Sequence, residues 1–284
     1  MKLPPLNIHA LLNEFDMKAD KSLGQNFLHD SSALQQIIDA AEIQKSDIVL
    51  EIGPGFGSLT RYLALLAGKV ICVELDHDFI PILGRVLTPY SNIEIIEGDI
   101  LKIRISNLVH DENYLVVANV PYNITSAIFR HLLDNFPRPK RLVLTIQKEV
   151  AQRICAEPGN MSLLALSVQI YGKPRIANII SAECFYPVPK VESAIIRVDM
   201  NPEPLISQEL LEPFFLLAKA GFSQKRKTLR NSISAGLRIT KEDAAFLLEN
   251  SGIDPMRRAE TLSIPEWSVL TKQFKKDKKQ LFEV

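Results

Sequence analysis

Ile48-Val-Leu-Glu-Ile52 runs directly into Gly53-Pro-Gly-Phe-Gly57, and the residues from Ser58 to Ala67 follow with helical periodicity. A short apolar run of this kind is typical of a buried strand. Closely spaced glycines let the backbone turn sharply and approach a ligand. Strand, glycine loop and helix in this order predict the first βα unit of a nucleotide-binding α/β fold.

Short apolar runs recur along the rest of the first two hundred residues. Further strands are predicted at 69–73, 93–97, 114–118, 141–146, 175–180 and 194–198, and helices at 31–41, 127–135 and 161–171. Strands that alternate with helices indicate a doubly wound sheet. Together with the first strand, this pattern predicts a seven-stranded, mostly parallel sheet.

The pattern changes after a proline-marked linker, Asn201-Pro-Glu-Pro204. Beyond it only helical periodicity remains, at 210–220, 227–235, 241–250 and 264–275. We therefore expect an α/β domain over residues 1–203 and a small all-helical domain over residues 204–284.

Charge is unevenly distributed along this chain of 284 residues, although its formal net charge is zero. Residues 219–284 carry 14 Lys and Arg against 8 Asp and Glu, so the rest of the chain is acidic by the same margin. Such asymmetry suggests a polyanion-binding region attached to an acidic body. A solvated helical surface explains the excess equally well, and the charge alone leaves both interpretations open.

The cysteines and the overall hydropathy indicate the cellular compartment of the protein. Cys72, Cys155 and Cys184 occur singly, without a CxxC pair, which favours a reducing compartment over a disulfide framework or a structural zinc site. No histidine has a partner at metal-ligand spacing. No leader pattern or membrane-length apolar run is apparent. We expect a cytoplasmic protein without membrane association or metal, and we expect a monomer.

The acids around the glycine loop bear on the type of ligand. Glu51 lies inside the first strand, two residues before Gly53, where it would repel a pyrophosphate. Glu74 ends the second strand 21 residues after Gly53, at the position where an acid reaches ribose hydroxyls, and Asp99 follows the third strand. The G-x-G-x-G spacing also differs from the dinucleotide pattern. These features favour S-adenosylmethionine, which is cationic and lacks phosphate, over a nicotinamide cofactor.

Asn119-Val120-Pro121-Tyr122 ends the apolar run that begins at Tyr114. Open α/β sheets bind ligands at the carboxyl ends of their strands. There the Asn119 amide and the Val120 carbonyl could accept hydrogen bonds from an exocyclic amine, while Pro121 stiffens the backbone. Tyr122 could lie flat against a base. An ordinary polar turn at a strand end is the alternative for these four residues taken alone.

Taken together, these motifs resemble the S-adenosylmethionine-dependent ribosomal RNA adenine dimethyltransferases, most closely those that act on small-subunit rRNA. The resemblance runs in order through Lys21–Leu28, Glu51–Gly57, Glu74, Asp99, Asn119–Tyr122, Phe185–Ser193, Phe222–Leu229 and Arg257–Leu262. It implies a Rossmann-like class I methyltransferase fold with a helical C-terminal domain that binds rRNA. It also implies dimethylation of the N6 amine of two adjacent adenosines near the 3′ end of small-subunit rRNA, linked to ribosome biogenesis.

The resemblance assigns roles to individual residues. The residues expected to hold the methyl donor are Asn26, Leu28, Glu51, Gly53, Gly55, Glu74, Asp99 and Asn119. Glu51 and Gly55 in this set come from the analysis of the glycine loop. The residues expected to hold the target base are Asn119, Val120, Pro121, Tyr122 and Phe185, with the two aromatic rings sandwiching it. An aromatic before Pro-x-Pro is otherwise more often a packing residue. The implied reaction is direct in-line methyl transfer without a general base, assisted by the preorganised acceptors.

Basic residues of the C-terminal segment are the candidates for RNA contacts: Lys225, Arg226, Lys227, Arg230, Arg257 and Arg258. Such side chains neutralise phosphates and position the substrate. The expected partner is small-subunit rRNA, within a partly assembled small subunit. The alternatives are the related antibiotic-resistance enzymes that methylate large-subunit rRNA, an assembly factor that only binds nucleic acid, and a dehydrogenase, which the loop spacing disfavours.

Overall fold

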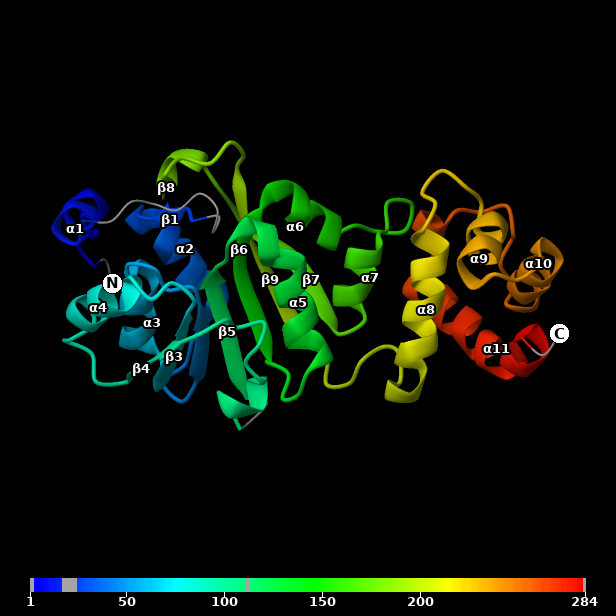
Figure 1. Ribbon diagram of the computed structural model, residues 1–284, viewed down its shortest axis with the longest axis horizontal. Helices are drawn as coiled ribbons and strands as arrows, with labels where there is room; N and C mark the ends of the chain where they lie inside the picture. The colour runs from blue at the N-terminus through cyan, green and yellow to red at the C-terminus, as the bar shows by residue number, and fades with distance from the viewer. Residues whose placement is uncertain (1–2, 17–24, 111–112, 283–284) are drawn as a thin grey trace. The chain divides into compact units, whose positions relative to one another are not determined.

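The computed structural model describes residues 3–16, 25–110 and 113–282 (Figure 1). The first four residues of the motif Lys21–Leu28 lie outside these ranges. Within the chain, Met1–Ala151 and Lys173–Met200 form one compact unit, and Gln152–Gly172 and Asn201–Val284 form a second. This division differs from the single boundary expected at residue 203, because a segment from the middle of the chain groups with the helical C-terminal part.

The first unit is built on a seven-stranded sheet, as predicted. Its strands are β2 (Ile48–Ile52), β3 (Lys69–Glu74), β4 (Ile93–Glu97), β5 (Tyr114–Asn119), β6 (Arg141–Gln147), β7 (Gly172–Ile180) and β9 (Ser193–Met200). They lie in the order β4-β3-β2-β5-β6-β9-β7. The neighbours from β4 to β6 pair in parallel, and β9 runs antiparallel to β6. The fold is a Rossmann-like, mostly parallel α/β sheet.

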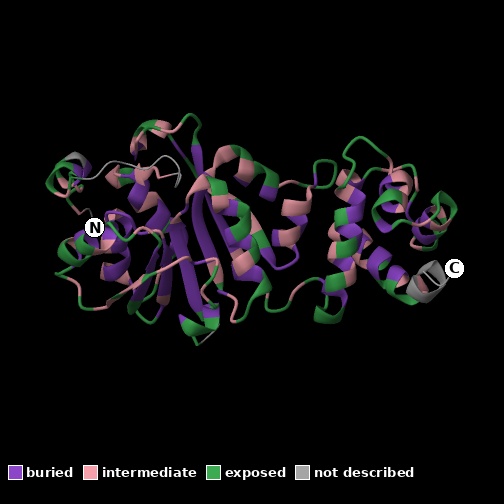
Figure 2. Ribbon diagram, viewed as in Figure 1, coloured by how far each residue is buried: buried purple, intermediate pink, exposed green. Residues whose placement is uncertain are grey.

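Helices cover this sheet because its central strands are apolar on both faces. Every residue of β5 but the last is buried, and the strands of the sheet are predominantly purple in Figure 2. The helices of this part are α1 (Ile8–Glu14), α2 (Ser31–Ala41), α3 (Ser58–Leu66), α4 (Phe79–Val86), α5 (Thr125–Asp134) and α6 (Lys148–Ile154). Leu34, Ile37 and Leu63 of α2 and α3 pack on one face, and Figure 1 shows α5 in front of the sheet.

A two-stranded ribbon, which the sequence patterns did not predict, joins residues far apart in the chain. Strand β1 (Phe27–Leu28) pairs antiparallel with β8 (Phe185–Tyr186), with Phe27 opposite Tyr186 and Leu28 opposite Phe185. Side chains alternate between the two faces of a strand. Leu28 and Phe185 accordingly belong to the sheet's hydrophobic core, while Phe27 and Tyr186 pack against a second cluster around Phe56 and Phe79.

The second unit consists of helices. They are α7 (Leu163–Gln169), α8 (Leu211–Phe222), α9 (Leu229–Leu237), α10 (Lys241–Asn250) and α11 (Ile264–Phe282). Trp267 is fully buried at the centre, and Phe222 stacks on it with ring centroids 5.9 Å apart. Gly236 lets α9 approach α8, because a Cβ at this position would lie 2.6 Å from Ala220. None of the helices within the described ranges is long and apolar enough to cross a membrane.

A buried arginine ties α2 to the sheet. Arg197 of β9, whose side chain is 8% exposed, contacts Glu42 at 2.6 Å and Asp199 at 2.8 Å. Its Nη1 also donates to the carbonyl of Ala40 at 2.9 Å, near the end of α2. The hydrogen bond from Arg197 is the largest single cause of a lowered pKa at Glu42. The guanidinium therefore caps the helix and neutralises two carboxylates together.

We expect Arg197→Leu to lower the free energy of unfolding by about 2 kcal/mol, because the buried Ala40 carbonyl loses its charged donor. Glu42 and Asp199 add little to this loss, since both are about half exposed and keep their contacts with Arg141. Urea unfolding at neutral pH measures the change. A carboxyl with a lowered folded pKa stabilises the fold above its unfolded pKa and loses that contribution as the pH falls. The variant should therefore lose less stability than the wild type as the pH falls below about 4.5, the ordinary value for Glu42.

The matched control is Lys69→Ala. Its ion pair with Glu94 is about half exposed on both sides, so it should change stability by less than about 1 kcal/mol. Equal effects of the two substitutions would contradict the role assigned to Arg197.

Candidate active site

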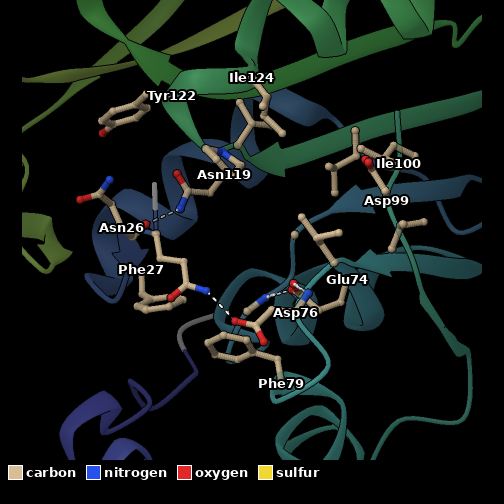
Figure 3. Close-up of a pocket in the computed structure, with 18 of the residues that line it drawn as sticks. Asn26, Phe27, Glu74, Asp76, Phe79, Asp99, Ile100, Asn119, Tyr122 and Ile124 are labelled. Carbon is tan, nitrogen blue, oxygen red and sulfur yellow. Dashed lines mark hydrogen bonds between the residues drawn. The ribbon is translucent and has the colours of Figure 1, made fainter. Parts of the chain in front are cut away.

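A pocket lies at the carboxyl ends of β2, β3 and β5, where the sheet order reverses direction (Figure 3). It encloses about 770 Å³ of empty space, part of it open to solvent. Among the residues expected from sequence, it brings together Asn26, Gly53, Gly55, Glu74, Asp99, Asn119, Val120, Pro121 and Tyr122. The strand ends at the switch point between β2 and β5 thus bring most of the expected site residues to one pocket.

The glycine loop forms the floor of this pocket. Gly55 has φ +54°, a conformation that other residues rarely adopt, and a Cβ there would lie 3.1 Å from the Phe27 ring. The N–H of Gly53 donates to the Val73 carbonyl at 2.9 Å, which fixes the loop to the end of β3. A side chain at position 55 would therefore both strain the backbone and displace the ring that covers it.

The charged side chains that line the pocket are all acidic. Glu74 accepts from the Gly55 N–H at 3.0 Å through Oε2 and from the Asp76 N–H at 2.9 Å through Oε1. Burial raises the pKa of Glu74, and these backbone hydrogen bonds oppose that effect. Asp99 accepts from the Leu101 N–H at 3.0 Å. No Lys or Arg is present among the described residues that line the pocket, so its electrostatics suit a cationic or polyhydroxyl ligand.

Glu51 and Leu28 lie beside the main pocket and do not line it. Both border an adjoining cavity of about 320 Å³, together with Gly53 and Asn119. Glu51 is 1% exposed, and the Cys72 thiol lies 3.5 Å from its Oε2. Burial raises the pKa of Glu51 to about 8, although hydrogen bonds from Thr60 and Cys72 act against it. This carboxyl is therefore mainly protonated at neutral pH.

The last residue of β5 and the residues that follow it form the second half of the site. The Nδ2 of Asn119 donates to the Asn26 carbonyl at 2.9 Å, so the amide oxygen is on the side opposite Asn26 (Figure 3). Val120 is buried, and its N–H donates to the Thr145 carbonyl at 3.3 Å. The Tyr122 hydroxyl and the Ser193 hydroxyl are 2.6 Å apart, and burial raises the Tyr122 pKa. The amide and the phenol ring are both held in fixed orientations.

Phe185 does not reach the pocket. Its side chain is 1% exposed and belongs to the hydrophobic core, because its place in β8 turns it to the same side as Leu28. A ring in this position cannot stack on a base, so the expectation of an aromatic sandwich is not supported for Phe185. Of the two aromatic side chains assigned to the base, only Tyr122 lines the pocket.

Other lining residues were not assigned a role from the sequence. Gln25 and Phe27 line the pocket, and both lie inside the motif Lys21–Leu28, which was quoted without a role for them. Asp76 follows Glu74 by two residues. Phe79 comes from α4 and packs on Phe27 with centroids 5.4 Å apart; nothing in the sequence pattern indicated it. No cluster of His, Cys, Asp and Glu suited to a metal occurs in the described ranges.

The basic residues of the second unit fall into two groups. Lys225, Arg226 and Lys227 are exposed on the loop before α9. This loop lies close to residues 255–258, because the N–H groups of Leu229 and Arg230 donate to the carbonyls of Arg257 and Pro255 at 2.7 and 3.2 Å.

Arg257 itself has a structural role. It pairs with Glu266 and donates to the Thr261 carbonyl at 2.8 Å, and the bond from Arg257 is the main cause that lowers the Glu266 pKa to about 2. Its guanidinium is thus engaged inside the unit, whereas the Arg258 side chain is about half exposed. The structure supports Arg258, and not Arg257, as a candidate for external contacts.

We expect Glu51→Gln to change how stability depends on pH. The folded pKa of about 8 lies above the ordinary 4.5, so the wild type loses stability as the pH rises through this interval. The variant has a neutral group at every pH. Between pH 5 and pH 8 its free energy of unfolding should therefore fall by at least about 1 kcal/mol less than that of the wild type. Urea unfolding at the two pH values measures this, and parallel pH dependences would contradict the neutral state of Glu51.

Comparison with known proteins places the chain among RNA methyltransferases. The sequence matches the family "Ribosomal RNA adenine dimethylase" over residues 16–275. The "Ribosomal RNA small subunit methyltransferase A" of Dehalococcoides mccartyi CBDB1 is 43% identical over 93% of this chain and 91% of its own length. That of Alkaliphilus metalliredigens is 41% identical over 95% of this chain and 96% of its own length.

Solved structures agree with this. A dimethyladenosine transferase from Plasmodium falciparum superposes with a TM-score of 0.77 and 31% identity over 89% of this chain and 98% of its own. A 23S rRNA methyltransferase superposes with a TM-score of 0.70 and 28% identity, over 88% of this chain and 100% of its own. On the strength of the family match and of relatives that share 41–43% identity across nearly its whole length, the chain belongs to the ribosomal RNA adenine dimethylase family.

Proposed function

We propose that the protein dimethylates the N6 amines of two adjacent adenosines near the 3′ end of small-subunit rRNA, with S-adenosylmethionine as methyl donor. One observation carries the proposal: the Asn119 amide is fixed by the Asn26 carbonyl, so its oxygen remains an acceptor at a pocket lined by carboxylates. The site therefore combines a cation-binding half with a half that accepts hydrogen bonds from an amine.

The lining of the pocket fits the donor. Its described residues include the acids Glu74, Asp76 and Asp99 and no Lys or Arg. Such a lining suits a ligand that has an ammonium and a sulfonium group and no phosphate. Glu74 would hold the ribose and Asp99 the adenine amine, with the glycine loop against the ligand. The Gly55 and Asp76 N–H groups keep the Glu74 carboxylate in place for that contact.

The last residue of β5 and the residues that follow it would act on the target amine. The Asn119 oxygen and the Val120 carbonyl would accept hydrogen bonds from the amine. These bonds favour a pyramidal nitrogen as positive charge develops on it. Tyr122, held by Ser193, lies against the base. The bound donor would supply an electrophilic methyl group, which would pass from its sulfonium sulfur to the amine nitrogen, and that nitrogen would then lose a proton to water. No general base is required.

The relatives support the small subunit as the source of the substrate. Curated relatives named for the small subunit are 40–43% identical to this chain, compared with 28% for the large-subunit enzyme. We extend the proposal to a monomeric, cytoplasmic enzyme that acts on a partly assembled small subunit. Its RNA contacts would come from Lys225, Arg226, Lys227, Arg230 and Arg258, all of which except Arg230 are exposed to solvent.

We expect Asn119→Ala to lower turnover at least about 100-fold, because it removes a preorganised acceptor at the reacting nitrogen. The assay follows labelled methyl transfer to immature small subunits, mature small subunits and large-subunit rRNA, with the product base identified by mass. Dimethyladenosine only in small-subunit RNA supports the proposal. Label in large-subunit RNA would assign the chain to the other branch of the family, and near-normal turnover of the variant would disprove the role of the amide.

We expect the triple substitution Lys225→Ala, Arg226→Ala and Lys227→Ala to weaken RNA binding and to flatten its salt dependence. Each lost phosphate contact should reduce the slope of log affinity against log salt by about 0.7–0.9. Filter binding over a salt series measures the slope. Lys241→Ala, an exposed lysine of α10, is the control, and an unchanged slope in the triple variant would contradict the assignment.

A further inference from the structure

Four hydrogen bonds run along the rim of the pocket and link the ends of three strands. The Gly55 N–H, after β2, donates to Glu74 at the end of β3, and Glu74 also accepts from the Asp76 N–H. Asp76 Oδ2 accepts from Gln25 Nε2 at 2.9 Å. The next residue, Asn26, accepts from Asn119 at the end of β5. Figure 3 shows the bond between Asn119 and Asn26.

Among the residues joined by these four hydrogen bonds, Gln25 and Asn26 are the ones that lie outside the sheet and its loops. β2 separates β3 from β5 in the sheet, and residues 25 and 26 connect the ends of β3 and β5 across this rim. The Phe27 ring, one residue further, lies against Gly55. The segment thus spans the donor-binding half and the base-binding half of the site.

We propose that the Gln25–Asp76 hydrogen bond is a positioning latch: it holds the Asn26 carbonyl where that carbonyl orients the Asn119 amide toward the target amine. The inference rests on the proposed function and adds to it. Gln25 and Asp76 are positioning residues, and they couple donor binding to acceptor geometry. Without the latch the Asn26 carbonyl moves, and the Asn119 amide loses the partner that distinguishes its oxygen from its nitrogen.

The charges around the latch make it testable by pH. Asp76 accepts a charge-assisted bond from Gln25 and a second bond from the Asp78 N–H at 3.1 Å. Glu74 and Asp99 line the same pocket, and Lys102 pairs with Asp99 at 3.4 Å. A carboxylate placed at position 25 would therefore face Asp76 with the other two acids nearby, and would bond to it only when the pair holds a proton.

The first experiment uses Gln25→Ala. We expect the affinity for S-adenosylhomocysteine, measured by calorimetry, and the turnover on small-subunit substrate each to fall about tenfold, the effect of losing one charge-assisted hydrogen bond. RNA affinity should not change. The matched control is Gln35→Ala, which removes a Gln–Asp bond of the same length on α2, Nε2 to Asp39 at 2.9 Å, and should leave both quantities unaltered.

The second experiment exchanges donor and acceptor. Gln25→Glu should bind S-adenosylhomocysteine progressively more weakly as the pH rises from 5 to 8, since the two carboxylates then repel, whereas the wild type varies much less. Adding Asp76→Asn restores a bond: the new amide donates to the carboxylate introduced at position 25, and its oxygen still accepts from the Asp78 N–H. The double variant should regain most of the affinity and lose the pH dependence.

The proposal is overturned if Gln25→Ala matches the wild type in affinity and turnover, or if the double variant is no better than Gln25→Glu. A wild type that binds S-adenosylhomocysteine but methylates none of the RNAs would disprove the proposed function instead, and the affinity and pH measurements would still decide the latch.

Discussion

Parallel pairing of β2 with both β3 and β5 is the constraint on which the site depends. After β2 the chain continues to β3 on one side of it, whereas β5 lies on the other side. No loop therefore crosses between the carboxyl ends of β2 and β5. The resulting space is where the glycine loop, Glu74 and Asn119 meet. Each of the three comes from a different strand end, so a single topological feature brings together groups up to 66 residues apart in the sequence.

Much of this was predictable because it follows from local patterns. The apolar runs predicted the seven strands, and the glycines predicted the loop. These features depend on neighbouring residues alone. The motif at 119–122 ends a strand at the switch point, so its place in the pocket also followed once the strand was recognised.

What the sequence did not reveal depends on distant pairing. Strand β1 finds its partner β8 158 residues later, and this pairing decides that Phe185 faces the core. Arg257 looked like its neighbour Arg258, yet a carboxylate on α11 engages it. Residues 152–172 join the helical unit through bonds such as that of the Gly159 N–H to the Glu260 carbonyl at 2.8 Å. No local pattern contains these partners.

The pairing of β1 with β8 also fixes how many residues the segment around Phe27 can contain. Phe27 turns toward the pocket and Leu28 toward the core, with only one peptide bond between them. Inserting or deleting a single residue between Gln25 and His29 would exchange these faces, putting an aliphatic chain over the glycine loop and an aromatic ring into the core. Changes of side chain affect one contact each, whereas a change of length disturbs the core, the loop and the rim simultaneously. The segment is therefore more tolerant of substitution than of insertion or deletion.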